Sequence, residues 1–310
     1  MTATKIVVLG TGGTIAGALD APGSMGYTAA RFAVADLLGG VPVPPGCELL
    51  HEQVAQVDSK DVAFAVWQQL LARCAHWLAQ PQVRAVVVTH GTDTIEETAY
   101  FLHAALAPAK PLILTCAMRP ADAPQPDGPR NLADALRVAA HPQAQGVAVV
   151  CAGTIHSAVD VAKVHPTRLD AFSSGDAGPL GLVHEDSIRM KRDWPAARVG
   201  KAQIAIETIV AASSWPRVDI VLNHAGADGG IVRSLLADGV QGLVVAGTGN
   251  GTLHHRLEAE LLQAQAQGVR VLRSTRCAQG QVTVMPGDRL PAHPLSPVKA
   301  RIDLLLELLA

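Results

Sequence analysis

The sequence predicts an α/β protein, with a larger N-terminal domain built on a mostly parallel sheet and a smaller C-terminal α/β domain. Three observations predict this class. Short runs rich in Val, Ile and Leu recur along the chain, and stretches of helical periodicity separate them. With 310 residues, 49 % of them hydrophobic, the chain can bury one large core or two separate cores.

The apolar runs are typical of strands that are buried on both faces, as in a parallel sheet covered by helices. We expect strands at 6–9, 83–89, 111–116, 147–151, 218–222, 242–245 and 269–272. The helical stretches are 61–79, 94–107, 129–140, 229–238, 253–267 and 297–309. The last helix has a clear start, because Ser296 suits an N-cap and Pro297 suits the first turn.

The alternation breaks between about 184 and 214, where the sequence is charged and contains Pro195. We interpret this segment as a linker, or as an extended hairpin followed by a linker. The predicted organisation is therefore an N-terminal α/β domain over 1–190, a linker over 191–214 and a C-terminal α/β domain over 215–310.

Charge and composition argue against several classes of function. The net charge is −2 with both signs scattered, and only 3 % of residues are aromatic, so we expect no nucleic-acid partner. The five cysteines include no C-x-x-C pair, so we expect reduced thiols and no metal site. The first apolar run is too short for a signal peptide and no run could span a bilayer, so we expect a cytoplasmic protein without a membrane partner.

A glycine-rich loop, TGGTIAG, follows the first predicted strand, and ligands of parallel sheets bind at such strand ends. A dinucleotide fingerprint fails because Ile15 stands at its third glycine, and a phosphate loop fails because Ala18 stands where lysine is required. What remains is Thr14 between glycines, either as a nucleophile or as the satisfied hydroxyl of a tight turn.

The motif HGTDTIEETAYFL begins at His90, at the end of another predicted strand. Thr94 and Glu97 form a capping-box pattern, which explains part of the motif as a helix start. Capping does not require Thr92 and Asp93, so this hydroxyl and carboxylate are candidates for catalysis or substrate binding. His90 could act as a base, but we favour a structural role for it.

Together the two motifs resemble the bacterial-type L-asparaginases, a family of threonine amidohydrolases. The resemblance continues through AMRP (117–120), DGPRNL (127–132), DVAKVHPT (160–167), GPLG (178–181), GTGNG (247–251) and LSPVKAR (295–301). It implies a flavodoxin-like N-terminal domain and hydrolysis of L-asparagine to L-aspartate and ammonia, without a cofactor or a metal. It also implies a homo-oligomer, a dimer or a homotetramer, in which a neighbouring subunit completes each site.

The resemblance assigns roles to single residues. Thr14 matches the nucleophile, and Tyr27 matches the loop tyrosine that hydrogen-bonds it. Thr92, Asp93 and Lys163 match a second triad, in which the lysine acts through the threonine hydroxyl. Because an alcohol is a weak nucleophile at neutral pH, Thr14 needs a proton acceptor before it can form an acyl-enzyme. Lys163 can serve as a base only if burial outweighs the effect of Asp93, which favours its charged form.

Ser59 and Asp93 match the residues that hold the α-carboxylate and α-amino groups of the substrate. Thr92, next to Asp93, is expected to contact the substrate as well. Ser59 could instead cap a helix over 60–79, or serve both roles. Lys60 stands where the secreted members commonly have glutamine, so it either adds a positive charge near the substrate or points away.

From the C-terminal domain, Thr252, with Asn250 as the alternative, falls at a position that the neighbouring subunit contributes. The segment that usually supplies a glutamate has none here, and Asp288 is a possible substitute. We therefore expect glutamine to be a weak substrate, because the longer side chain depends more on anchoring.

Two other hypotheses stay open. One is an amidohydrolase that acts on another amide, such as the asparaginase-like subunit of a tRNA-dependent amidotransferase, although such a subunit usually carries an extra N-terminal domain. The other is a catalytically silent protein that binds amino acids on the same scaffold. The joint presence of Thr14, Thr92 and Lys163 argues against a silent protein, because binding alone does not require a lysine–threonine pair.

Overall fold

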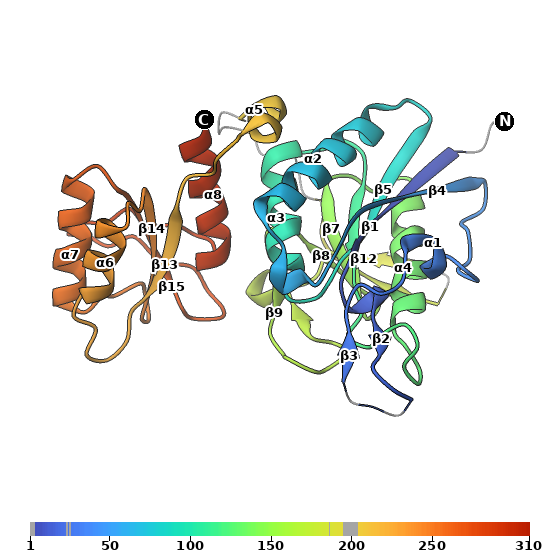
Figure 1. Cartoon of the computed structure of the whole chain (residues 1–310), viewed down its shortest axis with the longest axis horizontal. Helices are drawn as coiled ribbons and strands as arrows, with labels where there is room; N and C mark the ends of the chain where they lie inside the picture. Colours follow the sequence, from blue (N-terminus) through green and yellow to red (C-terminus); the bar gives the residue numbers. More distant parts are fainter. Residues whose placement is uncertain (1–3, 23, 25, 186, 195–203) are drawn as a thin grey trace. The chain divides into compact units, whose positions relative to one another are not determined.

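The computed structural model in Figure 1 describes residues 4–22, 24, 26–185, 187–194 and 204–310. The chain forms two compact units, Met1–Ile206 and Glu207–Ala310. The first contains a large, mostly parallel sheet and the second is a smaller α/β unit, which confirms the predicted fold class. The predicted linker over 191–214 lies in part, at 195–203, outside the described residues, and the short helix α5 (Ile206–Ala211) follows that gap.

The larger unit contains an eight-stranded sheet with the order β12-β11-β8-β7-β6-β5-β1-β4. The strands β1, β4, β5, β6 and β7 run parallel, and β8, β11 and β12 complete one side as antiparallel strands. Their bounds are Thr4–Gly12 (β1), Cys47–Val57 (β4), Val83–Thr89 (β5), Leu112–Thr115 (β6), Val147–Cys151 (β7), Thr154–Ser157 (β8), Gly181–His184 (β11) and Ser187–Met190 (β12).

Helices cover both faces of this sheet (Figure 1). The helix α4 (Gly128–Ala140) packs on one face, where Leu132 and Leu136 join Val8 and Val87 in a fully buried cluster. The helices α2 (Phe64–Ala79) and α3 (Ile95–Leu106) cover the other face, and the short α1 (Val34–Leu37) packs beside β1 and β4. Burial on both faces explains why the central strands consist of uninterrupted apolar runs.

The strand β4 was not predicted, and its sequence explains why. It is the edge strand next to β1, and its side chains are half-buried or exposed along its whole length. Its sequence, CELLHEQVAQV, therefore mixes polar and apolar residues and lacks the continuous apolar run on which the other predictions relied.

The smaller unit contains a three-stranded parallel sheet with the order β13-β14-β15. Its strands are Val218–Leu222, Gly242–Gly247 and Arg270–Thr275. The helices α6 (Gly230–Ala237) and α7 (His255–Ala266) pack on one face, and α8 (Pro297–Leu309) packs against all three strands from the other. Ser296 occupies the N-cap of α8 and Pro297 its first turn, although the serine side chain makes no capping hydrogen bond.

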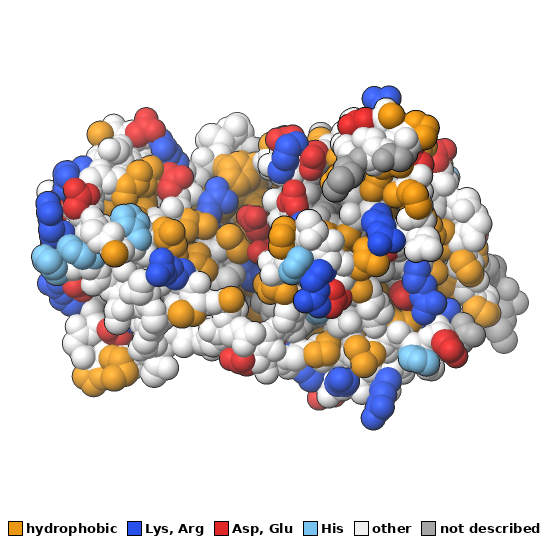
Figure 2. Space-filling model, turned by 90° about the horizontal axis from the view of Figure 1, so that it is seen from below, with side chains coloured by type: hydrophobic (Ala, Val, Ile, Leu, Met, Phe, Trp, Pro, Cys, Tyr) orange, Lys and Arg blue, Asp and Glu red, His pale blue; other side chains and the backbone are white. Residues whose placement is uncertain are grey.

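Basic and acidic side chains lie among one another on the face drawn in Figure 2. Within the described part of the chain, no helix has the length and hydropathy that crossing a bilayer requires.

Candidate active site

The loops that follow β1 and β5 meet at the carboxyl edge of the sheet. The two strands pair in parallel, with Gly10 opposite Thr89, so the residues after each strand emerge side by side. A Cβ atom on Gly13 would lie 2.2 Å from the Cα atom of Gly91, and one on Gly91 would lie 2.4 Å from Ser59 Oγ. Both positions therefore require glycine, because the two backbones touch each other.

Thr14 begins a short 3-10 turn, Thr14–Ala16, directly after this contact. Its hydroxyl is buried and lies 2.9 Å from the phenolic oxygen of Tyr27. Tyr27 reaches it from β3 (Tyr27–Thr28), which pairs with β2 (Ala18–Leu19) in a small two-stranded sheet. The tyrosine ring lies over Gly17, where an added Cβ would come within 3.1 Å of the ring, and it is 42 % exposed.

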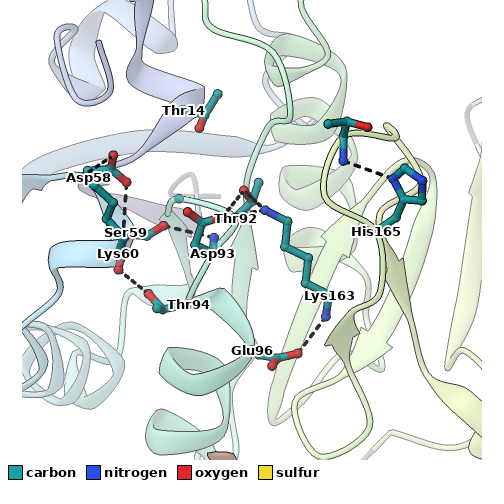
Figure 3. Close-up of polar contacts among 12 residues, drawn as sticks. Thr14, Asp58, Ser59, Lys60, Thr92, Asp93, Thr94, Glu96, Lys163 and His165 are labelled. Carbon is teal, nitrogen blue, oxygen red and sulfur yellow. Dashed lines mark hydrogen bonds and ion pairs between the residues drawn. The ribbon is translucent and has the colours of Figure 1, made fainter. Parts of the chain in front are cut away.

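Lys163 reaches the second motif from a different part of the fold (Figure 3). It lies on β9 (Ala162–Lys163), a two-residue strand that pairs with β10 (Phe172–Ser173). Its ammonium donates to Thr92 Oγ1 at 2.8 Å and to Asp93 Oδ1 at 2.6 Å. The lysine side chain is 17 % exposed, whereas that of Asp93 is 52 % exposed, so the carboxylate remains accessible beside a largely buried ammonium.

Glu96 holds the backbone of Lys163, and no sequence pattern pointed to this residue. Its Oε2 accepts the backbone N–H of Lys163 at 2.8 Å, as Figure 3 shows. The first turn of α3 and the loop before it thus bind both the backbone and the side-chain nitrogen of Lys163. The contact joins residues 67 positions apart, so no local spacing could have revealed it.

Ser59 is buried at the start of a 3-10 turn, Ser59–Asp61, and connects to the second motif. Its hydroxyl oxygen accepts the backbone N–H of Asp93 at 3.1 Å, and its carbonyl accepts the Thr94 hydroxyl at 2.7 Å. The expectation that Ser59 caps a helix over 60–79 is wrong, because that helix begins at Phe64 with Ala63 at its N-cap.

The predicted capping box at Thr94 is also wrong. Thr94 does occupy the N-cap of α3, but its side chain makes no capping hydrogen bond. Its hydroxyl instead donates to the carbonyl of Ser59, so it ties the two loops together rather than closing the helix end. The spacing of Thr94 and Glu97 is the same whether the threonine hydroxyl caps the helix or binds another loop. The sequence pattern alone therefore could not distinguish these two roles.

Lys60 is exposed, and its ammonium is held by its neighbours. It lies 3.0 Å from Asp58 Oδ2 and 2.7 Å from Asp61 Oδ2. The hydrogen bond to Asp61, together with that to Asp58, raises the pKa of Lys60 above its ordinary value. The positive charge that the sequence places after Ser59 is therefore shared with two adjacent carboxylates.

His90 has the structural role that we favoured. Trp67 Nε1 donates to Thr98 Oγ1 at 2.9 Å, and Thr98 Oγ1 lies 3.0 Å from His90 Nε2. The other ring nitrogen, Nδ1, lies 2.8 Å from the Gly91 carbonyl and acts as the donor there. Burial lowers the pKa of His90 to about 4 and outweighs the opposing hydrogen bond to Gly91, so the ring is neutral at pH 7. This chain of hydrogen bonds fixes the backbone of Gly91 against the loop of Thr14.

The residues expected from the C-terminal domain form hydrogen bonds within the second unit. Thr252 Oγ1 donates to the Thr248 carbonyl at 2.9 Å. The Asn250 side chain joins Thr283 twice, donating to its carbonyl at 2.9 Å and accepting from its N–H at 2.7 Å. Both residues therefore stabilise the loop between β14 and α7.

Asp288, considered as a substitute for the missing glutamate, has a structural role within the second unit. Its Oδ2 accepts from the buried guanidinium of Arg273 and from the backbone N–H of Met285 at 2.8 Å. Arg273 also donates to the carbonyl of Asn250 at 3.0 Å, so this ion pair supports the same loop.

The larger unit thus brings together six predicted residues at one sheet edge, in two groups. The first is Thr14 with Tyr27, and the second is Ser59 with Thr92, Asp93 and Lys163. Each group contains a threonine hydroxyl within hydrogen-bonding distance of a group that can exchange a proton. Among the described residues, no cluster of three or more His, Cys, Asp or Glu side chains could hold a metal ion.

Comparisons with known proteins cover nearly the whole chain. Residues 5–196 match the family "Asparaginase, N-terminal", and residues 217–309 match "Glutaminase/Asparaginase C-terminal domain". The chain is 35 % identical to L-asparaginase 2 of Bacillus subtilis (strain 168) over 98 % of its own length and 82 % of the relative. It is 36 % identical to the glutaminase-asparaginase of Pseudomonas fluorescens biotype A, over 96 % and 84 % of the two chains.

A similar structure has been solved by crystallography. A probable cytoplasmic L-asparaginase from Campylobacter jejuni superposes with a TM-score of 0.90 at 35 % identity, over 98 % of this chain and 95 % of that one.

Proposed function

Because the chain belongs to the bacterial-type L-asparaginase family and is an amidohydrolase of the L-asparaginase type, we propose that it hydrolyses L-asparagine through an acyl-enzyme on Thr14. The observation that carries the proposal is the buried Thr14 hydroxyl, 2.9 Å from the phenol of Tyr27 at the carboxyl edge of the sheet. A hydroxyl becomes a useful nucleophile when an adjacent group accepts its proton.

In the first step the Thr14 oxygen attacks the side-chain amide carbon of asparagine, and the Tyr27 hydroxyl accepts the Thr14 proton as it passes its own proton on to the amide nitrogen. The C–N bond then breaks and ammonia leaves with the proton, so that an ester joins Thr14 to the β-carboxyl of aspartate. Backbone N–H groups of the glycine-flanked loops are suited to stabilise the negative oxygen of the tetrahedral intermediate, and one such donor contributes on the order of 3 kcal/mol.

In the second step water hydrolyses the ester and restores the Thr14 hydroxyl. We assign to Lys163 a role in proton transfer through the hydroxyl of Thr92, supported by the 2.8 Å contact between them.

Ser59 and Asp93 are the proposed anchors of the substrate's charged groups. Asp93 is half-exposed beside Lys163, so its carboxylate can accept the α-amino group. Ser59 Oγ uses a lone pair for the Asp93 N–H, and its own O–H can donate to the α-carboxylate. Lys60 gives this end of the site additional positive charge only if a substrate draws it away from Asp58 and Asp61.

Ammonia release from L-asparagine, L-glutamine and D-asparagine tests the substrate assignment. We expect rapid release from L-asparagine and slower release from L-glutamine. Thr14→Ala should abolish turnover and leave substrate binding measurable by calorimetry. Near-normal turnover in this variant would contradict the role of Thr14, and release from none of the three amides would favour an amidohydrolase of a different specificity.

We further propose that the enzyme is a homo-oligomer in which Thr252 or Asn250 of one subunit completes the site of another. The support is that both residues belong to the second compact unit, whereas Thr14 belongs to the first. Mixing Thr14→Ala subunits with Thr252→Ala subunits tests this. If sites are shared, some sites in the mixture combine an intact Thr14 with an intact Thr252, so part of the activity should return. A mixture no more active than the average of the two variants alone would contradict the proposal. Light scattering measures the subunit number, for which we propose four.

The proposed location is the cytoplasm. The support is the similarity to the probable cytoplasmic L-asparaginase from Campylobacter jejuni, although a probable periplasmic L-asparaginase from Haemophilus influenzae is also a relative. Fractionation of the source cells tests this, and recovery from the periplasm would contradict it.

A further inference from the structure

Two buried cysteines, Cys116 and Cys151, lie next to each other at the same edge of the sheet. Cys116 directly follows β6, and Cys151 is the last residue of β7. These parallel strands are in register, with Thr115 opposite Val150, so the two cysteines are the next pair along the strands. Both thiols are free.

The backbone spacing at this pair suits a disulfide. Neighbouring strands of a sheet lie about 4.8 Å apart. Disulfides usually join Cα atoms that are about 4.4–6.8 Å apart. The strand register therefore already holds Cys116 and Cys151 at a distance that a disulfide can bridge.

One thiol of the pair is more acidic than the other. His156 lies on the neighbouring strand β8, and its Nδ1 lies 2.8 Å from Ser174 Oγ. The hydrogen bond from Cys116, aided by that from His156, lowers the pKa of Cys151 against the effect of burial. The thiolate is the form that attacks an oxidant, so Cys151 is the nucleophile and Cys116 is the second thiol.

A small cavity adjoins the backbone that carries the pair. It has a volume of about 340 Å³, and Asn131, Ala152 and Gly153 form part of its lining. Asn131 donates to the Cys116 carbonyl at 2.9 Å and accepts the Ala152 N–H at 3.0 Å, so this lining residue contacts the backbone of Cys116 and of the residue after Cys151. The cavity is several times larger than the roughly 30 Å³ that one water molecule occupies, so hydrogen peroxide fits within it.

The pair is also connected to the proposed nucleophile. Ala117, which follows Cys116, is fully buried and packs in a small cluster with Ile15 and Ala16. These two residues form the 3-10 turn that Thr14 begins. A disulfide is about 2.05 Å long, much shorter than any non-bonded contact between two sulfur atoms. Its formation therefore repacks the Cys116 side chain, next to Ala117 in the cluster that supports the turn of Thr14.

We propose that Cys116 and Cys151 form an oxidation site that a hydroperoxide converts to a disulfide, and that this bond lowers hydrolytic activity. The Cys151 thiolate attacks a peroxide oxygen, the O–O bond breaks, and an alcohol or water leaves as a sulfenic acid forms. The Cys116 thiol then attacks that sulfur, the S–O bond breaks, and water leaves. The two sulfur atoms give up two electrons, which reduce the peroxide.

Mass spectrometry tests the oxidation itself, independently of any catalytic activity. The full-length protein with Cys277→Ala is suitable, because Cys277 is an exposed thiol that would otherwise react. After treatment with hydrogen peroxide and alkylation, we expect peptides containing Cys116 and Cys151 to be joined with the loss of two hydrogens, and dithiothreitol to separate them. In Cys116→Ala, a dimedone adduct should appear on Cys151. If both thiols of the otherwise native protein remain alkylatable after treatment, the proposal is overturned.

The effect on Thr14 has its own readout, which rests on the proposed asparagine hydrolysis. Peroxide should lower kcat at least tenfold, with full recovery on reduction, because misplacing reacting groups by about 1 Å can cost 10²-fold. Cys116→Ala, which cannot form the disulfide, should keep its own activity through the same treatment. A cross-linked protein with unchanged kcat would overturn the connection to Thr14.

Discussion

The backbone of Lys163 is held by Glu96. The β9–β10 pair that carries Lys163 is two residues long on each side, so it provides few hydrogen bonds of its own. Glu96 provides a further bond at the Lys163 N–H, on the opposite end of the residue from Thr92. We therefore regard Glu96 as a positioning residue for the lysine.

The variants Glu96→Ala and Glu96→Gln test that role. Loss of the acceptor should lower kcat by about 10- to 100-fold with KM within about twofold, because the lysine is displaced while Ser59 and Asp93 still bind substrate. Glutamine keeps an acceptor oxygen, so Glu96→Gln should recover most of the activity. Steady-state kinetics measures both, and equal losses in the two variants would contradict a role through hydrogen-bond acceptance.

Thr94 and Ser59 show what residue-level patterns cannot determine. Both hydroxyl residues suit helix starts, and both lie near one, yet each contacts the loop of the other, 35 positions away in the sequence. Local spacing describes helix capping well but contains no information about a partner in another loop. The structure was needed to show that these residues connect two loops of the site.

At the scale of elements, the contact between the β1 and β5 loops supports the whole site. Gly13 has a φ of 77°, in the region that favours glycine, and its backbone lies directly against Gly91. His90, Thr98 and Trp67 hold Gly91 from behind through a chain of hydrogen bonds. The position of Thr14 therefore depends on the packing of two loops as well as on its own turn.

Gly13→Ala tests this packing, and Gly40→Ala is its matched control. Gly40 has nearly the same φ, 78°, but an added Cβ there meets no atom within 4 Å. Both variants should lose about 1 kcal/mol from backbone strain. Gly13→Ala should lose a further 1–3 kcal/mol or so from overpacking and at least tenfold in kcat/KM. Chemical denaturation and kinetics measure these effects, and equal behaviour of the two variants would contradict the account.

Sequence patterns predicted the strands that are rich in apolar residues and missed those that are not. The strands β5, β7 and β13 have the expected bounds: β7 is a continuous apolar run, and a single charged residue interrupts the run in β5 and in β13. The edge strand β4 and the two-residue strands β9 and β10 are stabilised by neighbours distant in the sequence, and their own composition does not indicate a strand. Of the site, motif resemblance supplied Thr14 and Lys163, but only the fold revealed Glu96.

At the scale of the whole molecule, His90 makes stability depend on pH. Its pKa of about 4 in the folded protein lies below the ordinary value of 6.5, so the unfolded chain binds more protons between these values. The free energy of unfolding should therefore fall as the pH drops from about 6.5 to 4, by roughly 3 kcal/mol from this group alone.

His90→Gln removes this titration. Urea unfolding at pH 7 and pH 4 should show the unaltered protein losing roughly 3 kcal/mol more than the variant over this range. Parallel losses in the two proteins would contradict a buried neutral His90.

The ester on Thr14 is the central claim, and its capture tests the account most directly. The enzyme is mixed with L-asparagine, quenched in acid within milliseconds, and digested for mass spectrometry. We predict an aspartyl adduct on the peptide that contains Thr14, and its disappearance in Thr14→Ala. An adduct on Thr92 instead, or turnover that continues in Thr14→Ala, would contradict the account.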